Sequence, residues 1–203
     1  LNPIVNSEIV DEKMAVLLMS EILKDVIQDR FLLTKLRALV AVPSGMKEEQ
    51  LIKIKRVLLE AGINNVSFVI NSVGARNMLD VDSQAHIMVV DIGKYLTDIS
   101  ILNEYNFTFG RTYFFGGVNM DKSITTFISD NHGLKVNDRT SEMVKNEIAS
   151  LYERDLNKIE YSGFDNDKLV KHEITANEIR VAIVGLYDKI FEFIEDILKQ
   201  VSK

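Results

Sequence analysis

The hydrophobic and polar positions form their clearest pattern in the middle of the chain, over residues 86–117. Four consecutive apolar residues at positions 87–90 are followed by Asp91 and Gly93. Apolar residues recur at positions 99, 101 and 102, after a polar loop. This pattern predicts a buried strand, a tight turn and a second strand. Aromatic residues at 107, 109, 113 and 114 extend the strand-rich pattern to the glycine pair Gly116 and Gly117. We expect a small β-meander with an acidic residue at the carboxyl end of a strand, where α/β sheets bind ligands such as phosphates.

Helix and strand patterns alternate in the first third of the chain. Their spacing predicts a helix, a strand, a second helix and a second strand over residues 11–28, 36–42, 46–61 and 66–70. Pro43 stops the first strand, and Ser44 and Gly45 are expected to form a cap-like turn before the second helix. Gly62 follows that helix at the position of a left-handed C-terminal cap. The alternation is typical of a parallel sheet.

The first of these helices has apolar residues that recur with helical spacing. The positions expected to face the core are Met14, Leu17, Leu18, Ile22 and Val26. A helix on a membrane surface is the alternative. It is disfavoured because the polar positions carry charges of both signs rather than a basic stripe.

The second half of the chain is predicted to be mostly helical. One helix covers residues 119–131 and ends at Gly133, and another covers residues 140–152 and buries Val144, Ile148 and Leu151. A polar segment over 154–173 is expected to contain short strands and turns. The last helix opens with a capping box of Thr175 and Glu178. Its buried face is predicted to consist of Ile179, Ile183, Leu186, Ile190, Phe193 and Ile197.

Length, charge and composition restrict the class of protein. The chain of 203 residues suffices for one large domain or two small ones, and its net charge of -6 argues against nucleic acid as a partner. It has no cysteine, so disulfides, thiolate metal sites and cysteine nucleophiles are excluded. Its three histidines, His86, His132 and His172, are too scattered to suggest a zinc site. No apolar run approaches the roughly 20 residues that cross a bilayer, and no signal peptide opens the sequence, so we expect a cytoplasmic protein.

A set of short segments then suggests a family. They are IVDEKM, LVAVPSG, EAGINNVSFVI, MVVDIG, TDISIL, FFGGVNMD and RTSEMVKNEIAS. In their order and approximate spacing, from about residue 9 to about residue 198, the chain resembles MreB, the bacterial actin homologue that organises cell shape. It resembles the heat-shock chaperones and plasmid-segregation actins of the same superfamily less closely.

The resemblance implies a fold, ligands and partners. The fold would be part of the α/β, actin-like (ribonuclease-H-like) ATPase fold, with mixed sheets and flanking helices. Residues 1–82 would be the remainder of the first actin-like lobe and residues 83–203 part of the second, with a boundary between residues 79 and 85. ATP or ADP with Mg²⁺ would bind between the lobes. The protein would form head-to-tail filaments in a rod shape-determining cytoskeleton, at the inner-membrane surface and with the cell-wall machinery as partners.

The resemblance also assigns roles to residues around the central turn. Asp91 matches the aspartate that holds Mg²⁺ through water, a role suited to a carboxylate beside phosphates. Gly93 matches the first glycine of the second phosphate loop, but Lys94, Tyr95 and Leu96 replace the small residues that follow it in the family. Side chains of this size would obstruct such a loop, although Lys94 could offer charge instead. The alternative for Asp91 is a strand-end aspartate that caps a turn.

Other family positions lie further away in the sequence. Asn71 matches the glutamate or glutamine that positions the attacking water; asparagine is shorter and cannot act as a base, so hydrolysis in the family's manner is not expected. Gly116 and Gly117 match the pair that approaches the nucleotide, with an ordinary turn as the alternative. Glu142 and Lys145 match adenosine-binding positions, and an exposed i,i+3 ion pair is their alternative role. The following Thr97 and Asp98 are expected to maintain the fold rather than to contact ligand.

Two further readings follow from departures from the family. The Asp-x-Gly-Thr phosphate loop and the C-terminal glycine-rich segment of the family have no counterpart in this sequence, so it is expected to be a piece of a longer protein or a reduced relative. The chain as given is expected neither to hydrolyse ATP nor to polymerise. The alternatives to an ATP-binding filament former are a nucleotide-independent scaffold that has lost ATP turnover, and a chaperone-like or plasmid-segregation relative.

Overall fold

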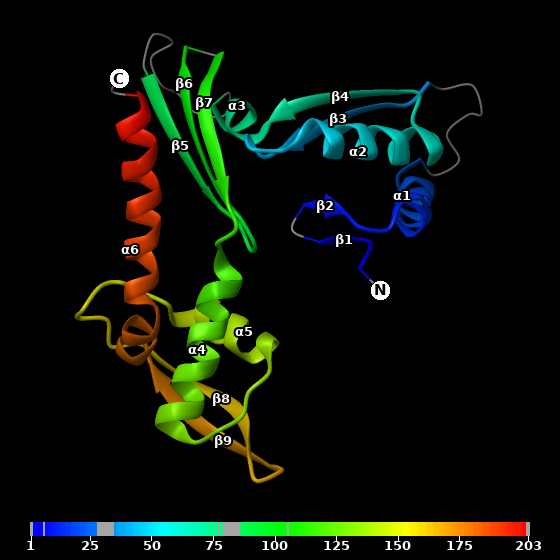
Figure 1. The fold of residues 1–203 in the computed structure, drawn as a ribbon. Helices are drawn as coiled ribbons and strands as arrows, with labels where there is room; N and C mark the ends of the chain where they lie inside the picture. The colour runs from blue at the N-terminus through cyan, green and yellow to red at the C-terminus, as the bar shows by residue number, and fades with distance from the viewer. Residues whose placement is uncertain are drawn as a thin grey trace. The chain divides into compact units, whose positions relative to one another are not determined.

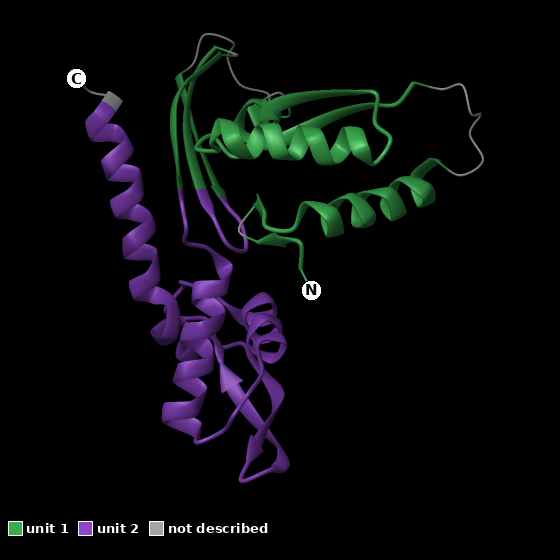
Figure 2. Ribbon diagram, turned by 45° about the vertical axis from the view of Figure 1, so that its right-hand side comes forward, with its two compact units in different colours: residues 1–91, 98–112 green, residues 92–97, 113–203 purple. Residues whose placement is uncertain are grey.

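The computed structural model describes residues 2–5, 7–27, 35–76, 78, 86–104 and 106–201. They divide into two compact units (Figure 2), which are described separately below. Unit 1 comprises residues 1–91 and 98–112, and unit 2 comprises residues 92–97 and 113–203. The predicted boundary between residues 79 and 85 lies outside the described residues, so the two predicted lobes stay a prediction. Within the described part of the chain, no helix is long and apolar enough to cross a membrane.

Unit 1 begins with alternating helices and strands (Figure 1). Its elements in this part are β1 (Ile4–Val5), β2 (Glu8–Ile9), α1 (Glu12–Ile27), β3 (Arg37–Val42), α2 (Glu48–Glu60), β4 (Asn65–Ile70) and α3 (Asn71–Arg76). The predicted helices and strands are confirmed, although residue 28 lies outside the described part. Strands β3 and β4 pair in parallel, as predicted, with Arg37 opposite Asn65 and Val42 opposite Ile70. Gly62 has a φ of 110°, which agrees with its predicted role after α2. Strands β1 and β2 and helix α3 were not predicted.

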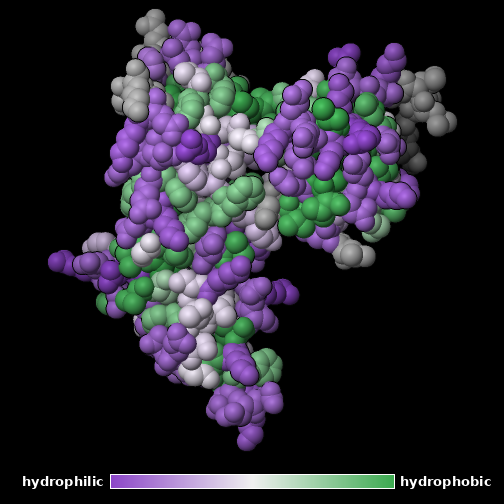
Figure 3. All heavy atoms as spheres, in the orientation of Figure 1, coloured by the Kyte–Doolittle hydropathy of each residue, from purple (hydrophilic) through white to green (hydrophobic). Residues whose placement is uncertain are grey.

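The prediction of which residues of α1 face the core is wrong. The five residues that were predicted to do so, from Met14 to Val26, are between 37% and 68% exposed. The helix instead buries Ala15, with Val16 and Met19 partly buried, against a cluster that includes Ile9 and Val57. Apolar residues surround most of α1, so their periodicity alone does not identify the face that packs. Figure 3 shows hydrophobic side chains on the surface of unit 1.

The turn after β3 is held by a buried carboxylate and not by a helix cap. The Ser44 hydroxyl donates to Asp98 Oδ1 at 2.7 Å, and the Ser44 N–H lies 3.1 Å from both carboxylate oxygens. The residue that precedes α2 is Lys47, without a side-chain cap. The cap-like role predicted for Ser44 is therefore wrong, because the hydroxyl bonds a distant strand. Asp98, which is only 4% exposed, maintains the fold as expected.

A three-stranded sheet completes unit 1 and continues into unit 2. It consists of β5 (His86–Ile92), β6 (Thr97–Asn103) and β7 (Asn106–Tyr113), hydrogen-bonded in sequential order. The first six residues of β6, from Thr97 onward, are all buried. The strand–turn–strand prediction is confirmed, and Asp91 is the second-last residue of β5.

Unit 2 contains helices around a hairpin. Its elements after the sheet are α4 (Gly117–His132), α5 (Asp138–Ile148), β8 (Lys158–Asp165), β9 (Lys168–Thr175) and α6 (Ala176–Val201). Gly133 ends α4 with a φ of 67°, as predicted. Helix α5 ends earlier than predicted because the backbone of Ala149 is extended, and Leu151 is exposed rather than buried. The polar segment contains strands, as predicted, and β8 and β9 pair as an antiparallel hairpin, which was not predicted.

The predicted start of α6 is confirmed in detail. The Thr175 N–H donates to Glu178 Oε2 at 2.8 Å, and the Glu178 N–H donates to Thr175 Oγ1 at 3.3 Å, which forms the capping box. His132 Nε2 lies 2.9 Å from Glu178 Oε1, and its Nδ1 lies 2.7 Å from the Tyr161 hydroxyl. Burial raises the pKa of Tyr161 to about 12. The buried face of α6 includes Ile183 and the other isoleucines that the pattern predicted.

These contacts make the stability of unit 2 depend on pH through Glu178. Burial alone raises the pKa of this carboxyl, but hydrogen bonds from Thr175 and His132 outweigh it and hold the pKa below the ordinary value of 4.5. We expect Glu178→Gln to lower the free energy of unfolding by about 1 kcal/mol at neutral pH. Because the folded-state pKa is lowered, the difference is complete above pH 4.5 and disappears as the pH falls through the folded-state value.

Urea unfolding of both proteins at a series of pH values would measure this difference. Glu195→Gln is the matched control, because Glu195 lies on the same helix in an exposed ion pair with Lys199. It should change stability by less than about 0.5 kcal/mol at every pH. A Glu178→Gln difference that stays constant down to strongly acidic pH would contradict the assigned role of the carboxylate.

Candidate functional site

Unit 2 contains a cavity of about 440 Å³ that gathers several predicted site residues. It is lined by Ile92, Gly93, Lys94, Gly117, Met120, Glu142, Lys145, Ala149, Ile183 and Tyr187. Four of these residues, Gly93, Gly117, Glu142 and Lys145, are among those that the resemblance predicts to contact a nucleotide. The volume lies within the range of roughly 300 to 1,000 Å³ that is typical of small-molecule sites. The residues come from the end of β5 and the turn after it, from α4, from α5 and the residue after it, and from α6, so the cavity is assembled from distant parts of the sequence.

The floor of the cavity is a close contact between the 93–96 turn and the start of α4. The Gly117 N–H donates to the Gly93 carbonyl at 2.9 Å, and the Val118 N–H donates to the Lys94 carbonyl at 2.8 Å. A Cβ atom on Gly116 would lie 2.5 Å from the Gly93 carbonyl oxygen. Gly116 therefore allows the turn to approach α4, and it does not line the cavity. The Gly117 and Val118 donors are already used by the protein.

Lys145 is held beside the cavity by a buried ion pair. Its ammonium lies 2.6 Å from Asp121 Oδ1 and 3.4 Å from the Gly117 carbonyl oxygen. The Lys145 and Asp121 side chains are only 16% and 5% exposed. Asp121 lies in the GG-x-x-MD segment of the resemblance but had been given no role. The partner of Lys145 is thus a residue that sequence reasoning missed.

Glu142 forms a second and more exposed ion pair. The Lys94 ammonium donates to Glu142 Oε1 at 2.8 Å, and the two side chains are 48% and 37% exposed. This hydrogen bond raises the pKa of Lys94 and lowers the pKa of Glu142. The alternative in which Glu142 and Lys145 pair with each other is wrong, because each side chain has a partner from another element.

Apolar side chains complete the cavity wall. Met120 comes from α4, and Ile183 and Tyr187 come from α6. The sequence pattern had assigned Ile183 to the buried face of the last helix, and Tyr187 follows the predicted buried position Leu186. Helical periodicity predicted that Ile183 faces inward, but it could not show that this residue borders a cavity. Together with the charged groups, the apolar side chains give the cavity a lining that is partly apolar and partly ionic.

The remaining predicted site residues, Asn71 and Asp91, lie in unit 1. Asn71 is the first residue of α3, and its amide donates to Asp91 Oδ2 at 3.4 Å. An amide cannot take up a proton from water as a carboxylate can. Within the described part of the chain, no group of three or more acidic or histidine side chains could hold a metal ion. The predicted role of Asp91 toward Mg²⁺ through water thus stays a prediction.

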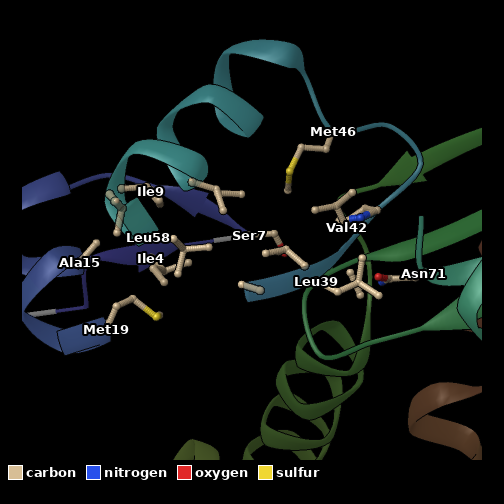
Figure 4. Close-up of a pocket in the computed structure, with 16 residues that line it drawn as sticks. Ile4, Ser7, Ile9, Ala15, Met19, Leu39, Val42, Met46, Leu58 and Asn71 are labelled. Carbon is tan, nitrogen blue, oxygen red and sulfur yellow. The ribbon is translucent and has the colours of Figure 1, made fainter. Parts of the chain in front are cut away.

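A second cavity lies within unit 1 and was not predicted. Its volume is about 550 Å³, and apolar side chains from β1, β2, α1, β3 and α2 line most of it (Figure 4). Ile4 and Leu58 lie on one side of this close-up, and Asn71 lies on the other. Asn71 borders this apolar cavity, and its amide also donates to Asp91.

Solved structures identify the class of fold. MreB5 of Spiroplasma citri bound to ADP matches 98% of this chain and 61% of its own, with a TM-score of 0.88 and 22% identity. The same protein bound to AMPPNP matches with a TM-score of 0.86 and 23% identity. The MamK double helical filament matches 98% of this chain and 59% of its own, with a TM-score of 0.76 and 19% identity. The chain therefore has an actin-like fold, as expected, and covers part of it.

Sequence comparisons identify the family. The MreB/Mbl protein family model matches residues 1–203, and the chain therefore belongs to the MreB/Mbl family. The cell shape-determining protein MreB of Escherichia coli K12 is 26% identical over 180 residues, which is 87% of this chain and 52% of that protein. The Haemophilus influenzae protein of the same name is 27% identical over 134 residues, or 64% of this chain and 38% of its own length. The chain spans about half the length of the Escherichia coli relative.

Proposed function

We propose that this protein is an actin-family cytoskeletal protein that binds ATP or ADP in the cavity of unit 2 and assembles into filaments that maintain cell shape. The observation that carries the proposal is the convergence of Gly93, Gly117, Glu142 and Lys145 on one cavity. The relatives add support, because MreB5 is described as bound to ADP and to AMPPNP, and MamK as a double helical filament. Membership of the MreB/Mbl family, whose relative in Escherichia coli is described as cell shape-determining, supports the role in cell shape.

The cavity residues suit a ribonucleoside phosphate. The Glu142 carboxylate would accept hydrogen bonds from ribose hydroxyls, and the Lys145 ammonium has three donors, two of which are used by Asp121 and Gly117. The apolar side chains of the lining, which include Tyr187, would contact the base of the nucleotide. A bound nucleotide would supply phosphate charge, and the resemblance assigns to Asp91 of unit 1 the role of holding Mg²⁺ through water. ATP hydrolysis is not part of the proposal, because Asn71 provides no base.

The proposal places the protein in the cytoplasm, with other copies of itself as its first partners. The inner-membrane surface and the cell-wall machinery are further proposed partners, by analogy with the family. The net charge of -6 disfavours nucleic acid. The nucleotide-independent scaffold is the alternative that the following experiment separates from this proposal.

The test is equilibrium binding of Mg-ADP to the full-length protein, together with sedimentation of filaments. We expect submillimolar binding, and we expect Glu142→Ala to weaken it by about tenfold, equivalent to about 1.4 kcal/mol. Glu147→Ala is the matched control, because Glu147 is an exposed glutamate on the same helix and does not line the cavity. Filaments without detectable ADP binding at millimolar concentration would favour the scaffold instead.

A further inference from the structure

Lys94 is the feature of the cavity that family membership does not explain. Its ammonium extends from the 93–96 turn to the carboxylate of Glu142 on α5, 48 residues away in the sequence. The turn has a lysine where the resemblance leads us to expect a small residue, and this lysine lines the cavity although its side chain is half exposed. A cation at this point changes the charge that a ligand meets.

The other donors of the cavity are held more firmly by the protein. Lys145 belongs to a buried ion pair with Asp121, which is costly to break. The Gly93 N–H donates to the Leu96 carbonyl at 2.8 Å, and the Gly117 N–H donates to Gly93. These two N–H groups cannot turn toward an anion without loss of the contacts, and the Lys145 ammonium has only its third donor to offer.

The Lys94–Glu142 pair differs because it can exchange partners at little cost. Both side chains are more than one third exposed, and exposed ion pairs of this kind contribute only about 0 to 1 kcal/mol. Lysine has a flexible four-carbon stem and a compact charge, so its ammonium can move without disturbing the backbone. A phosphate group carries more negative charge than a carboxylate and attracts the ammonium more strongly.

We infer that Lys94 is a partner-exchanging cation: it pairs with Glu142 before a ligand binds, and it transfers to a phosphate group when a ribonucleoside phosphate enters the cavity. The transfer releases the Glu142 carboxylate, which then accepts hydrogen bonds from the ribose. Lys94 thereby supplies charge that the altered phosphate loop no longer provides through a glycine-rich backbone. This inference rests on the proposed nucleotide site and adds a residue that sets the preference for phosphorylated ligands.

The test compares the dissociation constants of ADP and adenosine for the full-length protein and its variants. For Lys94→Gln we expect ADP binding to weaken about tenfold and adenosine binding to change less than twofold, because only ADP offers a phosphate. Lys94→Arg should retain most of the affinity for ADP. Added salt should weaken ADP binding to the unmodified protein more than to Lys94→Gln.

Lys158→Gln is the matched control, because Lys158 forms an exposed ion pair with Glu173 at 2.9 Å and does not line the cavity. It should bind both ligands as the unmodified protein does. If Lys94→Gln binds ADP equally well or more tightly, the lysine blocks the site or is unused, and the inference is overturned while the nucleotide site stands. Equal losses for ADP and adenosine would also overturn it. If the unmodified protein binds neither ligand, the proposed nucleotide site itself is wrong.

Discussion

Replacement of Lys145 by methionine is expected to lower the free energy of unfolding by about 3 kcal/mol. Methionine fills much of the same space but leaves the carboxylate of Asp121, whose side chain is 5% exposed, without its cation. An uncompensated buried charge costs far more than a lost surface ion pair. The same change removes the ammonium from the cavity and should abolish ADP binding.

A double-mutant cycle separates this effect from a simple change in packing. Asp121→Asn alone should cost about 1 kcal/mol, and the double variant should be more stable than Lys145→Met, with a coupling energy of about 2 kcal/mol. Urea unfolding followed by circular dichroism gives each value. Lys199→Met is the control, since that lysine forms an exposed pair with Glu195, and it should cost less than about 0.5 kcal/mol. If the loss of stability in the double variant equals the sum of the two single losses, Lys145 and Asp121 do not stabilise each other.

Substitution of Gly116 by alanine is expected to destabilise unit 2 by about 3 kcal/mol. The added Cβ would lie 2.5 Å from the Gly93 carbonyl oxygen and 2.9 Å from the Lys94 carbonyl carbon. Both are backbone atoms, so no side-chain rotation relieves the overlap. The turn would have to move away from α4, which would break the hydrogen bonds that the Gly117 and Val118 N–H groups donate to it. The cavity should lose its shape and its affinity for ADP.

Gly185→Ala should have the opposite effect on stability. Gly185 lies within α6, and nothing lies within 4 Å of the position of an added Cβ. Alanine is a better helix former than glycine, so this variant should be more stable by roughly 0.5 to 1 kcal/mol. The urea-unfolding midpoints of the Gly116→Ala and Gly185→Ala proteins test these two predictions. A Gly116→Ala protein as stable as the unmodified one would show that the turn and α4 are not in the close contact described here.

The two ion pairs at the cavity have different physical roles. The Lys145–Asp121 pair is buried and is expected to contribute rigidity as well as charge, whereas the Lys94–Glu142 pair is exposed and exchangeable. Substitutions in the first pair should therefore change stability and ligand binding together. Substitutions in the second should change ligand preference while the fold stays intact.

Much of the secondary structure could be predicted because it depends on neighbours in the sequence. Apolar periodicity identified α2, α4 and α6, and glycines at 62 and 133 were identified as helix ends from local backbone requirements. The capping box of Thr175 and Glu178 involves residues three positions apart. The family segments likewise lie within short stretches, and they led to the actin-like fold and to the candidate positions at Gly93, Gly117, Glu142 and Lys145.

The sequence by itself determined most of the longer elements, their order and the family, since periodicity, caps and motifs act over a few residues. Only the tertiary structure decided which side of α1 is buried and which charges are paired. Ser44 binds Asp98 across 54 positions, and Lys145 binds Asp121 across 24. The choice among several acceptors for one donor depends on how helices and strands pack, and packing is a property of the whole chain rather than of any local pattern.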